Sequence, residues 1–93
     1  MIYAYVSLTV TNPDSLAKYR EQGAPALARH GGKVETATAE TSVLDGSPNL
    51  PDMAALLSFP DRGAALAWIN DPELAETHAL RRGAGASDIV LLG

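Results

Sequence analysis

The segment 59–74 restricts the possible folds of this 93-residue chain more than any other part of the sequence. Residues 53–59 form an almost continuous apolar run with the length of a buried strand. Asp61 can cap a helix that follows directly, whereas Pro72 disfavours a helical conformation for Asp71 and should interrupt that helix. Because Asp71 can in turn cap a new helix over 72–82, we predict a buried strand followed by a broken helix.

The N-terminal residues predict a second strand, because apolar and polar side chains alternate over 2–10. One face carries Ile2, Ala4, Val6, Leu8 and Val10, and the other carries Tyr3, Tyr5, Ser7 and Thr9. A helix should follow, with Asn12 as its N-cap and Pro13 at the first helical position. We expect Pro25 to kink this helix over 21–24 and Gly31-Gly32 to end it.

The remaining elements complete a β-α-β-β-α-β order. Strands are predicted over 33–40, with a short extension at 42–44, and over 87–92, while 45–52 reads as a loop. This order is typical of an α+β, ferredoxin-like domain spanning residues 1–93, with an antiparallel sheet and helices on one face. The other sheet face would be left bare, so we expect a homodimer in which two sheets form a dimeric α+β barrel.

Composition excludes several classes of function. The net charge of −4, with only seven Lys and Arg, argues against a nucleic-acid binder. No apolar run approaches the roughly 20 residues of a membrane span, and no basic leader opens the chain. The absence of cysteine rules out disulfides and thiolate ligands and is compatible with a cytoplasmic location. We expect no metal and no cofactor, because the two histidines lie far apart and no dinucleotide fingerprint is present.

Several stretches, in order and over nearly the whole chain, make it similar to the domain-of-unknown-function 1330 family of small dimeric α+β-barrel proteins. These stretches are Val10-Thr11-Asn12-Pro13, Tyr19-Arg20, Ala28-Arg29-His30-Gly31-Gly32-Lys33, residues 59–68, Asp71-Pro72-Glu73-Leu74, Leu80-Arg81-Arg82 and Asp88-Ile89-Val90-Leu91. This chain departs from the family pattern in two places. The family often has an Arg-Gly-Gly-like stretch in the second strand, whereas residues 35–39 of this chain are Glu-Thr-Ala-Thr-Ala. The family also tends to have a shorter loop with an aromatic residue, whereas the loop 45–52 of this chain has none. Its structural relatives include cofactor-free monooxygenases, lactone isomerases and polyketide cyclases, which is an argument from fold alone.

Two histidines are the candidates for proton transfer. His30 precedes Gly31-Gly32 and could serve as a catalytic general acid or base, or could simply be a helix C-terminal cation. His78 is interpreted as a solvated residue in the middle of a helix.

The candidate substrate-binding residues are Tyr3, Tyr5, Ser7, Trp68 and Arg81. Tyr3 and Tyr5 share a strand face with Ser7 and could line the dimer cavity or only pack at the interface. Trp68 is interpreted primarily as a core residue and only secondarily as a substrate-binding residue. Arg81 and Arg82 would interact with a helix C-terminus, or one of them could bind a carboxylate or an enolate.

Two functions are compatible with these residues, and a third needs a companion domain. The first is a cofactor-independent enzyme of cyclase, isomerase or monooxygenase type, acting on an apolar aromatic or polyketide-like metabolite in the barrel cavity. The second is a non-catalytic ligand-binding or accessory module of the same fold. The third is a transport or regulatory domain of the ACT type.

Overall fold

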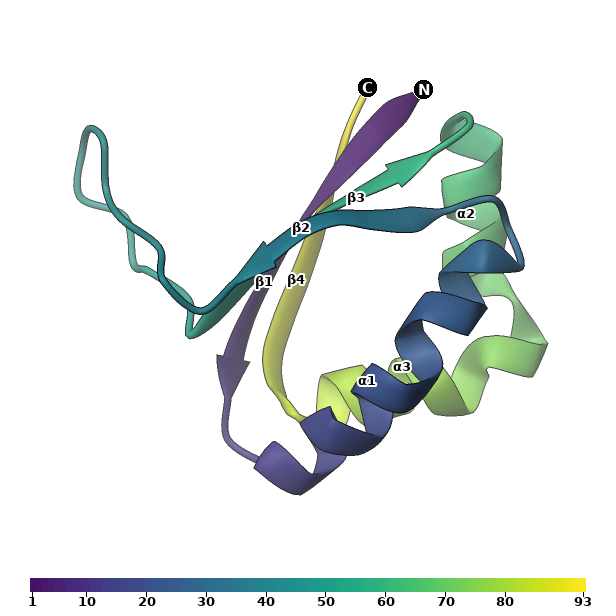
Figure 1. The fold of residues 1–93 in the computed structure, drawn as a ribbon, viewed down its shortest axis with the longest axis horizontal. Coiled ribbons are helices and arrows are strands. Elements are labelled where there is room, and N and C mark those ends of the chain that lie inside the picture. Colours follow the sequence, from purple (N-terminus) through teal and green to yellow (C-terminus); the bar gives the residue numbers. More distant parts are fainter.

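Four strands and two main helical segments follow one another in the predicted order (Figure 1). The computed structural model describes residues 1–93. The strands are β1 (Ile2–Val10), β2 (Lys33–Thr38), β3 (Met53–Phe59) and β4 (Gly85–Leu92). The helices are α1 (Pro13–Ala28), α2 (Arg62–Asn70), the short 3₁₀ helix η1 (Pro72–Leu74) and α3 (Ala75–Gly83). The fold is therefore ferredoxin-like α+β, as predicted. No helix has the length and hydrophobicity needed to cross a bilayer.

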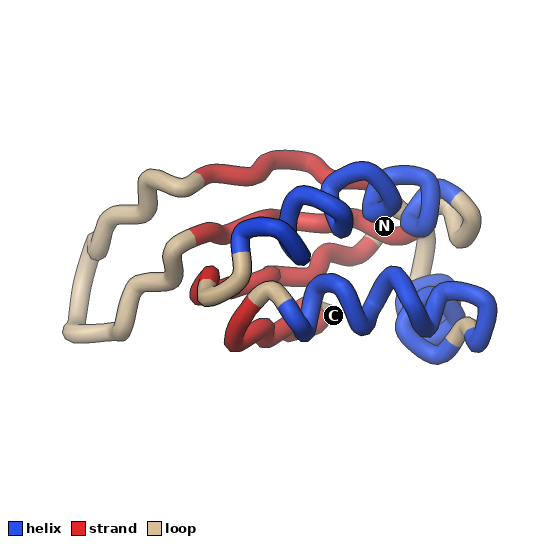
Figure 2. Tube along the Cα trace, turned by 90° about the horizontal axis from the view of Figure 1, so that it is seen from below, coloured by secondary structure: helices blue, strands red, loops and turns tan.

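The sheet has the strand order β2-β3-β1-β4 and is antiparallel throughout. Figure 2 shows the helices gathered on one side of the four strands. In the register, Ala4 lies opposite Leu57 of β3 and Leu91 of β4, and these side chains point toward the helices. The neighbouring residue Tyr5 lies opposite Leu56 and Val90 and points to the other face, because side chains alternate along a strand.

Two groups of buried residues fill the space between the sheet and the helices. The larger group comprises Ala4, Ala26, Leu27, Leu57, Phe59, Ala65, Trp68 and Leu74. The smaller comprises Leu8, Leu16 and Ala84. All of these residues come from the core face of a strand, from the inner side of a helix or from a connection between them, so the sheet has only one covered face.

Helix α1 begins as predicted and ends at Ala28, shortly before the predicted end at Gly31-Gly32. The side chain of Asn12 accepts a hydrogen bond from the backbone N–H of Ser15 at 3.2 Å. The helix then runs without interruption through Pro25 to Ala28. Pro25 lies in the last turn, where it cannot donate a hydrogen bond to the carbonyl of Glu21, and the buried Leu27 packs this turn against the sheet.

The break after α2 has the local cause that the sequence predicts. Asp61 Oδ1 accepts from the N–H of Ala64 at 2.8 Å and starts α2. Asp71 is extended, and its Oδ1 accepts from the N–H of Glu73 at 2.9 Å, which starts η1 at Pro72. The second helix therefore consists of α2, η1 and α3, with a change of direction at Asp71.

The strand ends differ from the prediction in two places. Strand β2 stops at Thr38 rather than at residue 40, and residues 42–44 form no strand, because this part of the chain leaves the sheet with the loop that projects beyond it (Figures 1 and 2). Strand β4 starts at Gly85 rather than at residue 87. A Cβ atom at Gly85 would overlap the carbonyl oxygen of Thr9, so only glycine lets β4 begin this close to β1.

Candidate functional site

An apolar cavity of about 220 Å³ lies between α1 and the covered face of the sheet. Small residues leave this space open, since Gly23, Ala24, Ala37 and Ala55 are among its lining residues. The other lining residues are Val6, Leu8, Leu16, Tyr19, Arg20, Leu27, Val34, Met53, Ala54, Leu57 and Arg81. An engineered apolar cavity of about 150 Å³ can hold benzene, so this space is large enough for one ring or a short branched chain.

Arginines supply all the charge in the cavity wall. Arg20, from α1, is exposed, and its Nη2 lies 3.0 Å from Met53 Sδ. Arg81, from α3, is only 3% exposed. Its guanidinium carbon lies 5.7 Å from the centre of the Tyr19 ring and 5.4 Å from that of Trp68, both within cation–π range. No carboxylate and no imidazole belongs to the cavity lining.

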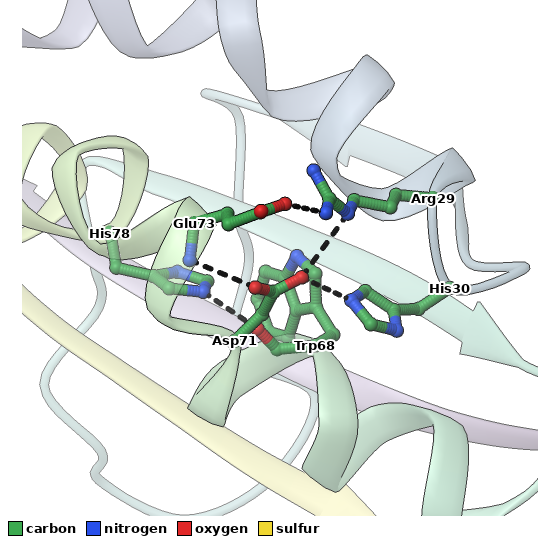
Figure 3. Close-up of polar contacts among 6 residues, drawn as sticks. All are labelled: Arg29, His30, Trp68, Asp71, Glu73 and His78. Carbon is green, nitrogen blue, oxygen red and sulfur yellow. Dashed lines mark hydrogen bonds and ion pairs between the residues drawn. The ribbon is translucent and has the colours of Figure 1, made fainter.

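His78 is buried next to Arg81, which corrects the prediction of a solvated residue. It is 2% exposed, and its Nε2 lies 2.9 Å from the carbonyl oxygen of Trp68 (Figure 3). Because a carbonyl oxygen only accepts, Nε2 carries the proton and Nδ1 is left to accept from Arg81 Nη1 at 2.8 Å. Burial lowers the pKa of His78, which agrees with a neutral ring.

His30 belongs to a polar cluster at the end of α1, not to the cavity wall. Its Nε2 lies 2.8 Å from Asp71 Oδ2, and Arg29 Nε lies 3.3 Å from the same oxygen (Figure 3). Arg29 also pairs with Glu73. The cluster therefore joins the end of α1 to the cap of η1, and its one imidazole is already oriented by a carboxylate.

Trp68 is a core residue, which agrees with its primary interpretation from the sequence. It is 3% exposed, lies 5.5 Å from Phe59 and meets the His78 ring edge-on at 4.7 Å, centre to centre. Its Nε1 is buried and has no hydrogen-bond partner. Trp68 does not line the cavity, but through Arg81 it is one side chain away from it.

Comparison with models of protein families identifies the family of this chain. The model of the family described as "Domain of unknown function (DUF1330)" matches residues 1–93. The chain belongs to this family. None of the curated proteins compared with it matches.

Two solved structures share the fold of this DUF1330 chain. The crystal structure of RPA0582, a protein of unknown function from Rhodopseudomonas palustris, has a TM-score of 0.73 at 23% identity, over 98% of this chain and 79% of the other. The crystal structure of methylated RPA0582 gives a TM-score of 0.75 at 22% identity, over 98% and 78%. At this level of identity the likeness concerns the fold.

In this DUF1330 protein the predicted binding residues fall into separate places. Tyr3 and Tyr5 are 39% and 40% exposed and lie with Ser7 on the open face of the sheet, on the opposite side from the cavity. Arg81 lies in the cavity wall, and Trp68 lies behind it. That Tyr3, Tyr5 and Ser7 line a second cavity between two copies stays a prediction.

Sequence reasoning did not find the cavity, and it assigned His78 to the wrong side of its helix. The spacing of Leu74, His78 and Arg81, at i, i+4 and i+7, does place all three on one helical face. Since Leu74 is apolar, that spacing is a signal that this face is buried. Similarly, Leu16, Tyr19, Gly23 and Leu27 follow helical spacing along the inner side of α1.

Proposed function

We propose that this protein binds a small, largely apolar molecule in the cavity under α1. The observation that carries the proposal is the wall of this half-open cavity of about 220 Å³, in which 12 of the 15 lining residues are hydrophobic. Ligand sites are typically apolar hollows with a few polar groups that orient the ligand. We therefore favour the hypothesis of a ligand-binding module over that of an enzyme.

The position of His30 is the reason for placing binding ahead of catalysis. A general base must reach the proton that it removes, directly or through one water. His30 is instead held by Asp71 at the end of α1 and is not part of the cavity wall. The wall offers the phenol of Tyr19 and two guanidinium groups, which suit orientation of a ligand better than proton abstraction.

Filling the cavity tests this proposal. Ethylbenzene, a neutral probe, should shift the NMR signals of Val6, Leu27 and Val34 in the wild-type protein. Ala55→Leu places a larger side chain in the cavity and should abolish these shifts, whereas Ala67→Leu, on an exposed position of α2, should leave them unchanged. Absence of shifts in the wild type, or their persistence in Ala55→Leu, would contradict the proposal.

A cofactor-independent enzyme of cyclase, isomerase or monooxygenase type, acting on an aromatic or polyketide-like metabolite, is the second candidate. One observation favours it: the His30–Asp71 contact of 2.8 Å resembles the pairing that orients an imidazole for proton transfer. If this pair is catalytic, His30→Ala should lower turnover of such a metabolite by about 10²–10⁴-fold and leave the fold unchanged. Equal turnover in the variant would remove this candidate.

Self-association through the open sheet face is part of the proposal. Tyr3, Tyr5, Val90 and Leu92 are 39–55% exposed on this face, and they form one apolar surface together with Leu56. Exposure of a large contiguous apolar surface is unfavourable in water, and a second copy offers a matching one. We therefore retain the dimeric α+β barrel as the assembly in which the cavity operates.

A further inference from the structure

Arg81 is a buried cation without a counter-charge. Arg81 is only 3% exposed and takes part in none of the four ion pairs of the chain. The cations of these pairs are Arg29, His30 and Lys33. A charge taken out of water costs free energy that an opposite charge or hydrogen bonds must offset. In a protein with net charge −4, the lack of an acidic partner at this position requires an explanation.

The contacts that Arg81 does make leave part of the guanidinium unused. Nη1 donates to Nδ1 of the neutral His78, and the faces of Tyr19 and Trp68 lie within cation–π range. Nε is buried and has no hydrogen-bond partner. Nε and Nη2 form the side of a guanidinium that binds a carboxylate through two parallel hydrogen bonds, and it is this side that His78 does not occupy.

The unused side belongs to a residue of the cavity wall. Arg81 lines the cavity together with Arg20, and no acidic residue lines it. The remaining wall is apolar apart from the Tyr19 hydroxyl, so the cavity combines space for a hydrocarbon body with one buried cationic end. A carboxylate bound there would supply both the missing charge and the missing hydrogen-bond acceptor.

We propose that the ligand of this cavity is a small carboxylic acid with a single aromatic ring or a short branched chain, and that its carboxylate binds Arg81. This inference rests on the proposed function and adds the chemical class of the ligand. The two observations are independent: the volume of about 220 Å³ limits the size of the hydrocarbon part, and the unpartnered Nε of Arg81 can donate to a carboxylate oxygen. Arg20, on the exposed side of the wall, adds a second positive charge that attracts an anion toward the cavity.

Calorimetric titration with a matched pair of probes tests the charge requirement. Benzoate and benzamide share shape and ring, but only benzoate is an anion, and acetate at equal ionic strength reports binding of the carboxylate alone. Wild-type protein should bind benzoate about tenfold or more tightly than benzamide, and acetate much more weakly than either. Equal affinity for benzoate and benzamide would overturn the inference and leave the proposed function intact, whereas binding of neither would overturn both.

Variants of neighbouring arginines locate the charge that matters. Arg81→Met should reduce the benzoate-to-benzamide ratio to about one while benzamide still binds, and Arg82→Met, one residue further on an exposed position, should keep the wild-type ratio. Arg81→Lys keeps the charge without the fork and should give an intermediate ratio. A full benzoate preference in Arg81→Met, or its loss in Arg82→Met, would contradict the role of Arg81. If Arg81→Met does not fold, the wild-type and Arg81→Lys ratios decide.

Discussion

The carbonyl oxygen of Trp68, in the last turns of α2, accepts a hydrogen bond from Nε2 of His78 in α3 at 2.9 Å. This contact crosses the break at Asp71 and fixes one tautomer of the imidazole, so that Nδ1 accepts from Arg81. A single ring therefore ties two helical segments together and also holds the cation of the cavity wall.

The buried state of His78 predicts a loss of stability in mild acid. Its pKa is lowered below 6.5, first by burial and then by Arg81 and Arg82, against the opposing effects of the Trp68 carbonyl and Asp71. Below about pH 6.5 the unfolded chain takes up a proton that the folded chain resists, so the free energy of unfolding falls as pH decreases and is unaffected by this group above that pH.

Thermal unfolding between pH 5 and 8 checks this prediction. His78→Gln should flatten the fall in Tm below about pH 6.5, while His30→Gln, the control for the other histidine, should retain it. An unchanged pH profile in His78→Gln would contradict the assignment of the effect to His78.

Truncation of Trp68 should damage folding. Trp68→Ala is expected to lower the free energy of unfolding by about 3–5 kcal/mol, because it removes a buried aromatic side chain that contacts Phe59, His78 and Arg81. Trp68→Phe should cost clearly less, since Nε1 has no hydrogen-bond partner to lose. Urea denaturation measures both, and equal losses would contradict the prediction, because a phenyl ring at this position would then recover none of the packing of the indole.

Loss of the Asp71 carboxylate should lower the free energy of unfolding more than loss of the His30 side chain that it contacts. Asp71 caps η1 and contacts Arg29 and His30, and its side chain is 10% exposed. Asp71→Ala should cost about 1–2 kcal/mol through loss of the cap, and His30→Ala about 0.2–1 kcal/mol. Asp71→Asn should fall between them, because an amide oxygen still caps but no longer attracts the cations. A larger loss in His30→Ala would contradict this order.

The open sheet face should control the assembly. We expect a dimer by light scattering, and Val90→Glu should shift it toward monomer by placing a charge in the apolar surface. Leu66→Glu, at a comparably exposed position on α2, is the matched control and should leave the dimer intact. A wild-type protein that is monomeric at micromolar concentration would contradict the prediction.

Local signals in the sequence were enough for the fold but not for the site. The caps at Asn12, Asp61 and Asp71 act over two or three residues, so they can be recognised without knowledge of the packing. The burial of His78 depends instead on how α3 lies against α1 and the sheet, which is a property of the tertiary structure.

The cavity depends on still longer-range packing. Gly23 and Ala24 lie in α1, whereas Ala37 and Ala55 lie in two strands of the sheet. Each is unremarkable in its own segment, and the space appears only when the segments come together. Strand propensity likewise continues past Thr38, but β2 ends there because its hydrogen-bonded partner β3 begins only at Met53, and Thr38 already pairs with Ala54.

The contact between Arg81 and Trp68 also gives the protein its own optical reporter. Trp68 is the sole tryptophan of the chain, and the guanidinium carbon lies 5.4 Å from its ring centre. Indole emission responds to the electric field across the ring, and an anion placed beside Arg81 changes that field. Occupancy of the cavity by a carboxylate can therefore be followed by the intrinsic fluorescence of the unlabelled protein, with Trp68 buried away from quenchers in solution.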